Sequence, residues 1–140
     1  SCNRMLNYTI TAHSAKGGEA HGVANNGAVR FDASVSGQDG LPNPTELLLT
    51  ALAACMLKNV ERFSEILKFD YETADIEIYG VRNDSPPFIS EITYTLTITS
   101  DMEERTKDLL HRNILKFGTI TNTLARSTQL NGTLKTTYQQ

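Results

Sequence analysis

Along the first 42 residues, apolar and polar positions alternate with the two-residue period that is typical of half-buried β-strands. The alternation is clearest over Val29–Val35 and is also present over Tyr8–Ala12. The turn signals Lys16-Gly17-Gly18 and Asn25-Asn26-Gly27 separate these runs. The pattern therefore predicts a small β region ahead of the first helix.

The helix that follows is expected to begin with a capping box. Asn43 can accept a hydrogen bond from a first-turn amide, a proline suits the next position, and Glu46 can reach back to the Asn43 amide. The helix should continue to about Lys68. Between residues 47 and 57 only Thr50 is polar, so this part should be surrounded by protein on all sides.

The second half of the chain again shows patterns typical of strands and of helices. Ser100 lies three residues before a glutamate, which predicts a second capping box, and Gly118 is expected to end the helix that starts there. Strands grouped apart from helices predict an α+β fold with a mainly antiparallel sheet and a long central buried helix. The further elements expected are strands over residues 74–81, 92–99 and 130–138, and helical turns over residues 120–126.

Composition narrows the class of protein. A length of 140 residues, with 39% hydrophobic and 21% charged residues, predicts one globular domain over residues 1–140. The net charge of −3 and the lack of a basic stripe argue against a nucleic-acid partner. The apolar runs are shorter than the roughly 20 residues that a membrane span needs. No signal peptide is recognisable and there are only two cysteines, so we expect a cytoplasmic protein.

Cys55 lies about three turns into the apolar helix, and two interpretations of it stay open. A free cysteine is commonly an inert, small hydrophobic residue. As a nucleophile it would act as the thiolate, which in an apolar site needs a nearby cation. Cys2 is a bystander or an alternative second thiol. No metal or cofactor is expected, because His13, His21 and His111 lack the spacing of metal ligands.

The run from Asn43 to Cys55, NPTELLLTALAAC, resembles the helix motif of the OsmC/Ohr family of osmotically induced and organic hydroperoxide resistance proteins. The order of the expected elements is similar over nearly the whole chain. The resemblance implies an intertwined homodimer with two long helices at its centre and active sites at the subunit interface. It also implies reduction of organic hydroperoxides by a pair of cysteines, assisted by an arginine and a glutamate.

On this resemblance Cys55 matches the peroxidatic cysteine, and Gly118 stands where the second, resolving cysteine would be. Thr45 lies ten residues before Cys55, where the peroxidases carry glutamate. Glu46 fits instead the Pro-x-Glu-Leu-Leu-Leu motif of a less characterised branch, and Arg30 is the candidate arginine. Nine helical residues place Glu46 and Cys55 on opposite sides of the helix and ~13 Å apart along it, so Glu46 could act only on a second chain.

The function implied is a single-cysteine, thiol-dependent peroxidase for organic hydroperoxides in oxidative-stress defence. Arg30 would favour the Cys55 thiolate, Glu46 of the partner chain would orient Arg30, and Leu52 and Met56 would hold the alkyl part of the substrate. An external thiol reductant would rescue the sulfenic acid, which otherwise advances to irreversible acids. The alternative is a non-catalytic protein that binds a small apolar ligand at the dimer interface, so enzyme activity stays open.

Overall fold

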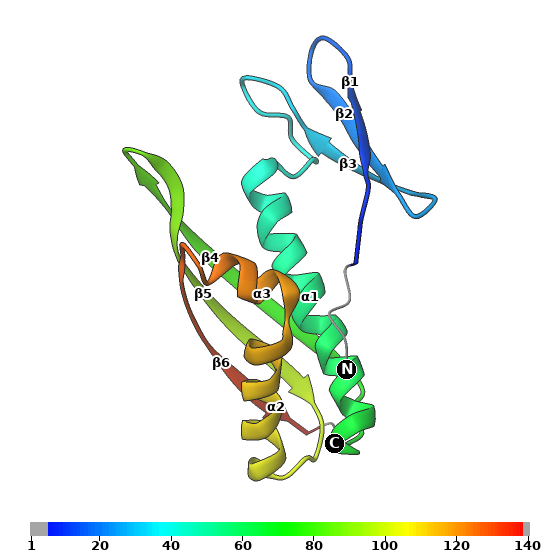
Figure 1. The fold of residues 1–140 in the computed structure, drawn as a ribbon, viewed down its shortest axis with the longest axis vertical. Coiled ribbons are helices and arrows are strands. Elements are labelled where there is room, and N and C mark those ends of the chain that lie inside the picture. Colours follow the sequence, from blue (N-terminus) through cyan, green and yellow to red (C-terminus); the bar gives the residue numbers. More distant parts are fainter. Residues whose placement is uncertain (1–5, 139–140) are drawn as a thin grey trace. The chain divides into compact units, whose positions relative to one another are not determined.

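A computed structural model describes residues 6–138 of the chain (Figure 1). Two compact units divide between Leu48 and Leu49, and each is described by itself. The α+β class and the expected order of elements are confirmed, whereas a single domain over residues 1–140 stays a prediction. In chain order the elements are β1 (Thr11–Ser14), β2 (Glu19–Ala24), β3 (Gly27–Asp32), α1 (Pro44–Leu67), β4 (Ala74–Asp84), β5 (Pro87–Thr99), α2 (Glu104–Phe117), α3 (Thr119–Leu124) and β6 (Gln129–Thr137).

The first unit contains an antiparallel sheet in the order β1-β2-β3. The turn between β1 and β2 includes Gly18, whose φ of 102° is one that L side chains rarely adopt. The turn between β2 and β3 consists of Asn25 and Asn26, both at positive φ, as tight hairpins require. The strand expected over Tyr8–Ala12 begins later, at Thr11, because the hairpin turn sets which residues pair.

β3 ends at Asp32, three residues before the expected end at Val35. The Asp32 carboxylate accepts hydrogen bonds from the Ser34 hydroxyl, the Ser34 amide and the Gln38 amide. These bonds turn the chain away from the sheet, and the bond from the Ser34 hydroxyl is the main cause that lowers the pKa of Asp32. Val35 is consequently fully exposed.

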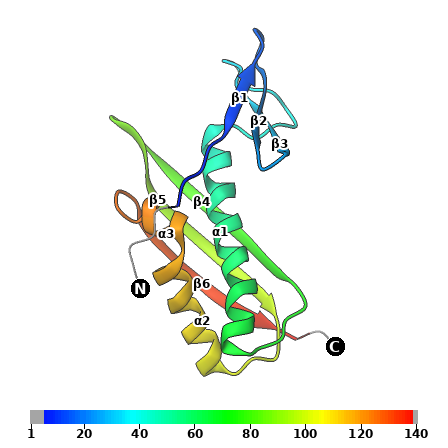
Figure 2. The ribbon, with the colours of Figure 1, turned by 45° about the vertical axis from the view of Figure 1, so that its right-hand side comes forward.

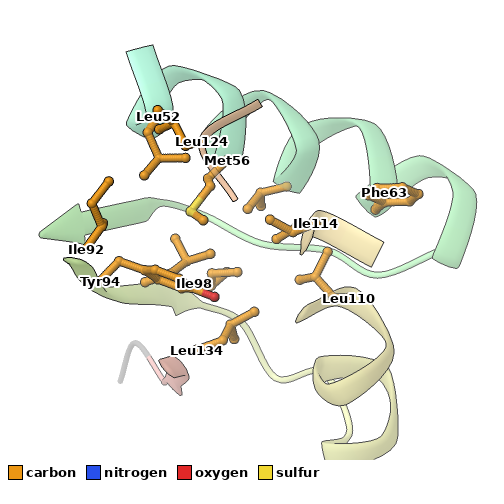
Figure 3. Packing of buried hydrophobic residues seen from close by; sticks show 12 residues of the cluster. Leu52, Met56, Phe63, Ile92, Tyr94, Ile98, Leu110, Ile114, Leu124 and Leu134 are labelled. Carbon is orange, nitrogen blue, oxygen red and sulfur yellow. The ribbon is translucent and has the colours of Figure 1, made fainter. Parts of the chain in front are cut away.

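The second unit contains a sheet in the order β4-β5-β6. β4 and β5 pair antiparallel, whereas β6 pairs parallel to β5 after α2 and α3 have carried the chain back along the sheet. Figures 1 and 2 show α1 and α2 on the same face of this sheet. Figure 3 shows the side chains that meet there, from α1, β5, α2, α3 and β6: Leu52, Met56, Val60, Phe63, Ile92, Tyr94, Leu96, Ile98, Leu110, Ile114, Leu124 and Leu134.

Tyr94 lies at the centre of this cluster, only 2% exposed. Its neighbour across the parallel pairing is Gly132, where a Cβ atom would lie 2.4 Å from the Tyr94 ring. The Tyr94 hydroxyl is 2.6 Å from Nε2 of His111, a hydrogen-bond distance. Burial raises the pKa of Tyr94 to about 12 and lowers the pKa of His111, against an opposing effect of Asp108.

The second capping box was predicted wrongly. α2 begins at Glu104, four residues after Ser100, and its N-cap Glu103 makes no side-chain capping bond. Ser100 is buried, and its hydroxyl makes other hydrogen bonds: it donates to the Asp70 carbonyl and accepts from the Met102 amide. Ser100 therefore fastens the end of β5 to the segment that follows α1.

Candidate functional site

Cys55 lies in α1 and is partly exposed. It adjoins the stripe of α1 that faces the core, which the buried residues Leu52, Met56, Val60 and Phe63 form at helical spacing. Cys55 is therefore not part of the fully buried core, and the residue keeps some exposed surface in the single chain.

Asn59, one turn after Cys55, is the polar side chain beside the thiol. It is 8% exposed, and its Nδ2 donates to the Cys55 carbonyl at 3.0 Å and lies 3.8 Å from Sγ. Sulfur accepts weak, long hydrogen bonds, so the Asn59 amide is the donor that the structure places beside the thiol. Asn59 was not among the predicted site residues, although a polar residue four positions after the cysteine, on an apolar helix, could have indicated it.

The surroundings of Cys55 in the structure differ from the expected ones in two respects. Leu52 and Met56 are completely buried in the core, so they do not line an accessible surface for an alkyl group. The apolar half of α1 is also not covered on all sides in one chain, because Leu48 is 38% exposed and Ala54 is exposed. The pattern of apolar residues overstated what a single copy of the chain buries.

Glu46 takes part in the capping box that the sequence predicts. The Glu46 amide donates to Oδ1 of Asn43 at 2.8 Å, and the Asn43 amide donates to Oε1 of Glu46 at 3.0 Å. The Glu46 side chain is exposed. Its capping role is therefore confirmed, and its catalytic role stays a prediction.

Arg30 lies on β3 directly opposite His21 of β2, and its side chain is exposed. It belongs to the first unit with Glu46, whereas Cys55 belongs to the second. The arrangement of Arg30, Glu46 and Cys55 as one site stays a prediction. Val29, the residue before Arg30 on β3, is 57% exposed.

Gly118 joins α2 to α3, and its position has no room for a side chain. A Cβ atom there would lie 2.7 Å from Oγ1 of Thr121 and 2.9 Å from the Ile114 carbonyl oxygen. Thr121 is buried, and its hydroxyl has no hydrogen-bond partner among the described residues. Neighbouring atoms of α2 and α3 therefore occupy the space that a side chain at position 118 would need. Cys2, the other candidate for a second thiol, lies outside the described residues.

The first unit carries an apolar hollow of about 350 Å³. The hollow is lined by Ile10, Gly22, Val23, Ala24, Gly27, Ala28, Val29, Phe31 and Leu47.

Between residues 6 and 138 no helix is long and apolar enough to cross a membrane. Over the same range, no three or more His, Cys, Asp or Glu residues gather as a metal site.

The fold is similar to several solved structures. An OsmC-like protein from Mycoplasma pneumoniae has a TM-score of 0.84 at 20% identity, covering 94% of this chain and 97% of that one. The organic hydroperoxide resistance protein OhrB of Bacillus subtilis has a TM-score of 0.65 at 16% identity, covering 92% and 98%. An organic hydroperoxide resistance protein OsmC from Legionella pneumophila has a TM-score of 0.70 at 15% identity, covering 96% and 99%.

Comparison with curated proteins gave no match. The family model described as OsmC-like protein matches residues 37–132, a range that includes α1 with Cys55 and Glu46 and extends into β6. That range is well over half of the 140 residues. The chain therefore belongs to the OsmC family.

Proposed function

We propose that the protein is a single-cysteine, thiol-dependent peroxidase that reduces organic hydroperoxides in the cytoplasm, with Cys55 as its nucleophile. The observation that carries the proposal is the partly exposed Cys55 on the family's α1 motif, with the buried Asn59 amide beside its sulfur. Two solved structures of similar fold are named as organic hydroperoxide resistance proteins, which supports the same chemistry here.

The reaction proceeds in two stages. The Cys55 thiolate attacks one peroxide oxygen, an S–O bond forms while the O–O bond breaks, and the alkoxide leaves and takes up a proton as the alcohol. A small thiol then displaces water from the sulfenic acid to form a mixed disulfide. A second thiol releases Cys55 and leaves as the disulfide. The closed position at Gly118 supports an external reductant, because no side chain fits there in the present packing.

The site is proposed to be completed by a second copy of the chain in a homodimer. Arg30 would then stabilise the Cys55 thiolate, because a guanidinium keeps its charge even when partly buried. Glu46 of the partner subunit would orient Arg30. The exposed apolar positions Leu48 and Ala54 on α1 support such a contact, since apolar helix surface is normally covered by protein.

Exposure to one equivalent of cumene hydroperoxide tests this function. We expect mass spectrometry to find one added oxygen on Cys55, trapped by a sulfenic-acid reagent, and peroxide consumption in the presence of a small thiol. The Cys55→Ser variant should lose this consumption. The matched control is Cys2→Ser, which removes the other cysteine and should keep it. An unmodified Cys55, or an active Cys55→Ser variant, would overturn the proposal.

The second candidate is a non-catalytic protein that binds a small apolar ligand, which the apolar hollow of the first unit favours. Cys55→Ser, together with a further variant in the hollow, separates the two functions. Binding of an apolar fluorescent probe should then weaken in Val29→Asp, which places a charge in the hollow, and be unaffected by Cys55→Ser. Oxidation of Cys55 with turnover of peroxide would exclude a purely binding role.

A further inference from the structure

His13 and His21 form a pair of imidazoles across β1 and β2. They are directly opposite each other in the antiparallel register, so their side chains share one face of the sheet. The ring centroids are 5.8 Å apart, with an angle of 46° between the planes. The two histidines are eight positions apart along the chain, and the hairpin register brings them together.

The separation of the two rings suits a shared metal ion. A nitrogen–metal bond of about 2.0–2.1 Å puts the centre of each ligated ring about 3 Å from the ion. Two imidazoles on one ion therefore have centroids no more than about 6 Å apart. The observed 5.8 Å lies within that limit.

The hairpin holds the pair in place before any ion binds. At Gly18, in the turn that joins the two strands, a Cβ atom would lie 2.4 Å from Cβ of Ser34, so this turn packs closely against the chain after β3. Because the strands are fixed, binding need order only the two side chains. Prior ordering of ligands in this way raises affinity.

Two charged residues share the face with the pair. Glu19 lies two positions before His21 on β2, so it projects on the same side and favours a cation. Arg30 lies opposite His21 on β3 and disfavours a cation by repulsion. The nearby Asp32 carboxylate is committed to hydrogen bonds from Ser34 and Gln38.

We propose that His13 and His21 form a two-imidazole chelate for a divalent transition-metal ion, with water in the remaining coordination positions. Imidazole suits copper, nickel and zinc, and the general order of affinities places Cu²⁺ above Ni²⁺ and Zn²⁺. Both ligands come from the first unit, whereas Cys55 belongs to the second. Between residues 6 and 138 no third His, Cys, Asp or Glu completes the site, so binding of the ion should be weak and reversible.

Titration with Ni²⁺ by calorimetry, and with Zn²⁺ by NMR of the imidazole signals, tests the chelate. The measurements use the full chain and a Cys2→Ser/Cys55→Ser background, because thiolates also bind these ions. We expect the signals of His13 and His21 to shift together at one Zn²⁺ affinity. His13→Gln and His21→Gln should each weaken Ni²⁺ binding by more than about tenfold, because a chelate gains strongly from its second linked ligand.

The control variants are His111→Gln, which removes the remaining histidine, and Arg30→Gln. The first should leave the Ni²⁺ affinity unchanged, and the second should leave it unchanged or raise it, because a repelling charge is removed. Equal affinity in the parent, His13→Gln and His21→Gln proteins would overturn the proposal. So would loss of all binding on replacing the cysteines, or a Zn²⁺ shift at only one of the two histidines.

Discussion

At the residue scale, the packing of Tyr94 on Gly132 shows how one missing side chain organises the core. The Tyr94 ring occupies the space over Gly132 that a methyl group would need, and its hydroxyl reaches His111 of α2. An aromatic side chain on a strand often covers a glycine of the neighbouring strand in this way. Gly132 therefore lets the ring, β6 and α2 meet at one point.

Replacing this glycine should destabilise the fold strongly. In Gly132→Ala the new Cβ atom would lie 2.4 Å from the Tyr94 ring, and overpacking of this kind costs about 1–3 kcal/mol. Urea denaturation measures the change in the free energy of unfolding. The control is Gly22→Ala, another strand glycine, where the nearest atom is 3.7 Å from the new Cβ and the change should stay within about 0.5 kcal/mol. Equal stability of both variants would contradict the packing.

The pH dependence of stability should carry a contribution from His111. Burial lowers the pKa of His111 in the folded chain, so the unfolded chain binds more protons there as the pH falls below about 6.5. His111 therefore favours the fold above that pH, and this stability is lost on acidification. We expect the loss of stability between pH 7.5 and pH 5.5 to be smaller in His111→Gln than in the parent, by urea denaturation. An unchanged or larger loss would contradict this role.

At the scale of elements, the start of α1 is where sequence and structure agree most closely. Both reciprocal bonds of the capping box form, because all its participants lie within four consecutive residues, Asn43 to Glu46. The start of α2 was wrong for the opposite reason. Ser100 has the local signal of a cap, but a long-range partner, the Asp70 carbonyl, takes its hydroxyl.

The capping box also separates the two roles of Glu46. Glutamine keeps the capping geometry, so Glu46→Gln should retain stability, whereas Asn43→Ala should lose about 1 kcal/mol. Thermal unfolding checks both. If Glu46 also acts in the proposed peroxidase site, Glu46→Gln should lose peroxide turnover while the protein stays folded. Full turnover in Glu46→Gln would limit this residue to capping.

The parts of the candidate site were predictable to different degrees. Cys55 and Glu46 follow from a continuous motif on one helix. Asn59 was missed, because no single local signal marks a polar partner one turn away. His13 and His21 were not expected to bind a metal, because their spacing along the chain does not reveal that they lie opposite each other in the hairpin. The closed position at Gly118 depends on Thr121 and the Ile114 carbonyl, which only the packing of α2 on α3 brings together.

At the scale of the whole molecule, the proposed site depends on two copies of the chain. We expect a particle of twice the 15.5 kDa chain mass by light scattering. If Glu46 acts across the interface, mixing refolded Cys55→Ser and Glu46→Gln chains should restore about a quarter of the parental turnover, because half of the dimers are mixed and each has one intact site. Each variant refolded alone is the control. A monomer, or a mixture without recovery, would contradict this arrangement.

The parallel pairing of β6 with β5 has a consequence for folding during synthesis on the ribosome. β6 covers one edge of β5 and supplies Gly132 beneath Tyr94, yet it is synthesised after β4, β5, α2 and α3. Until it leaves the exit tunnel, β5 presents an unpaired edge and an uncovered aromatic ring, features that invite aggregation. The core of the second unit therefore stays incomplete until β6 pairs with β5, and before that step the nascent chain should be most sensitive to proteases.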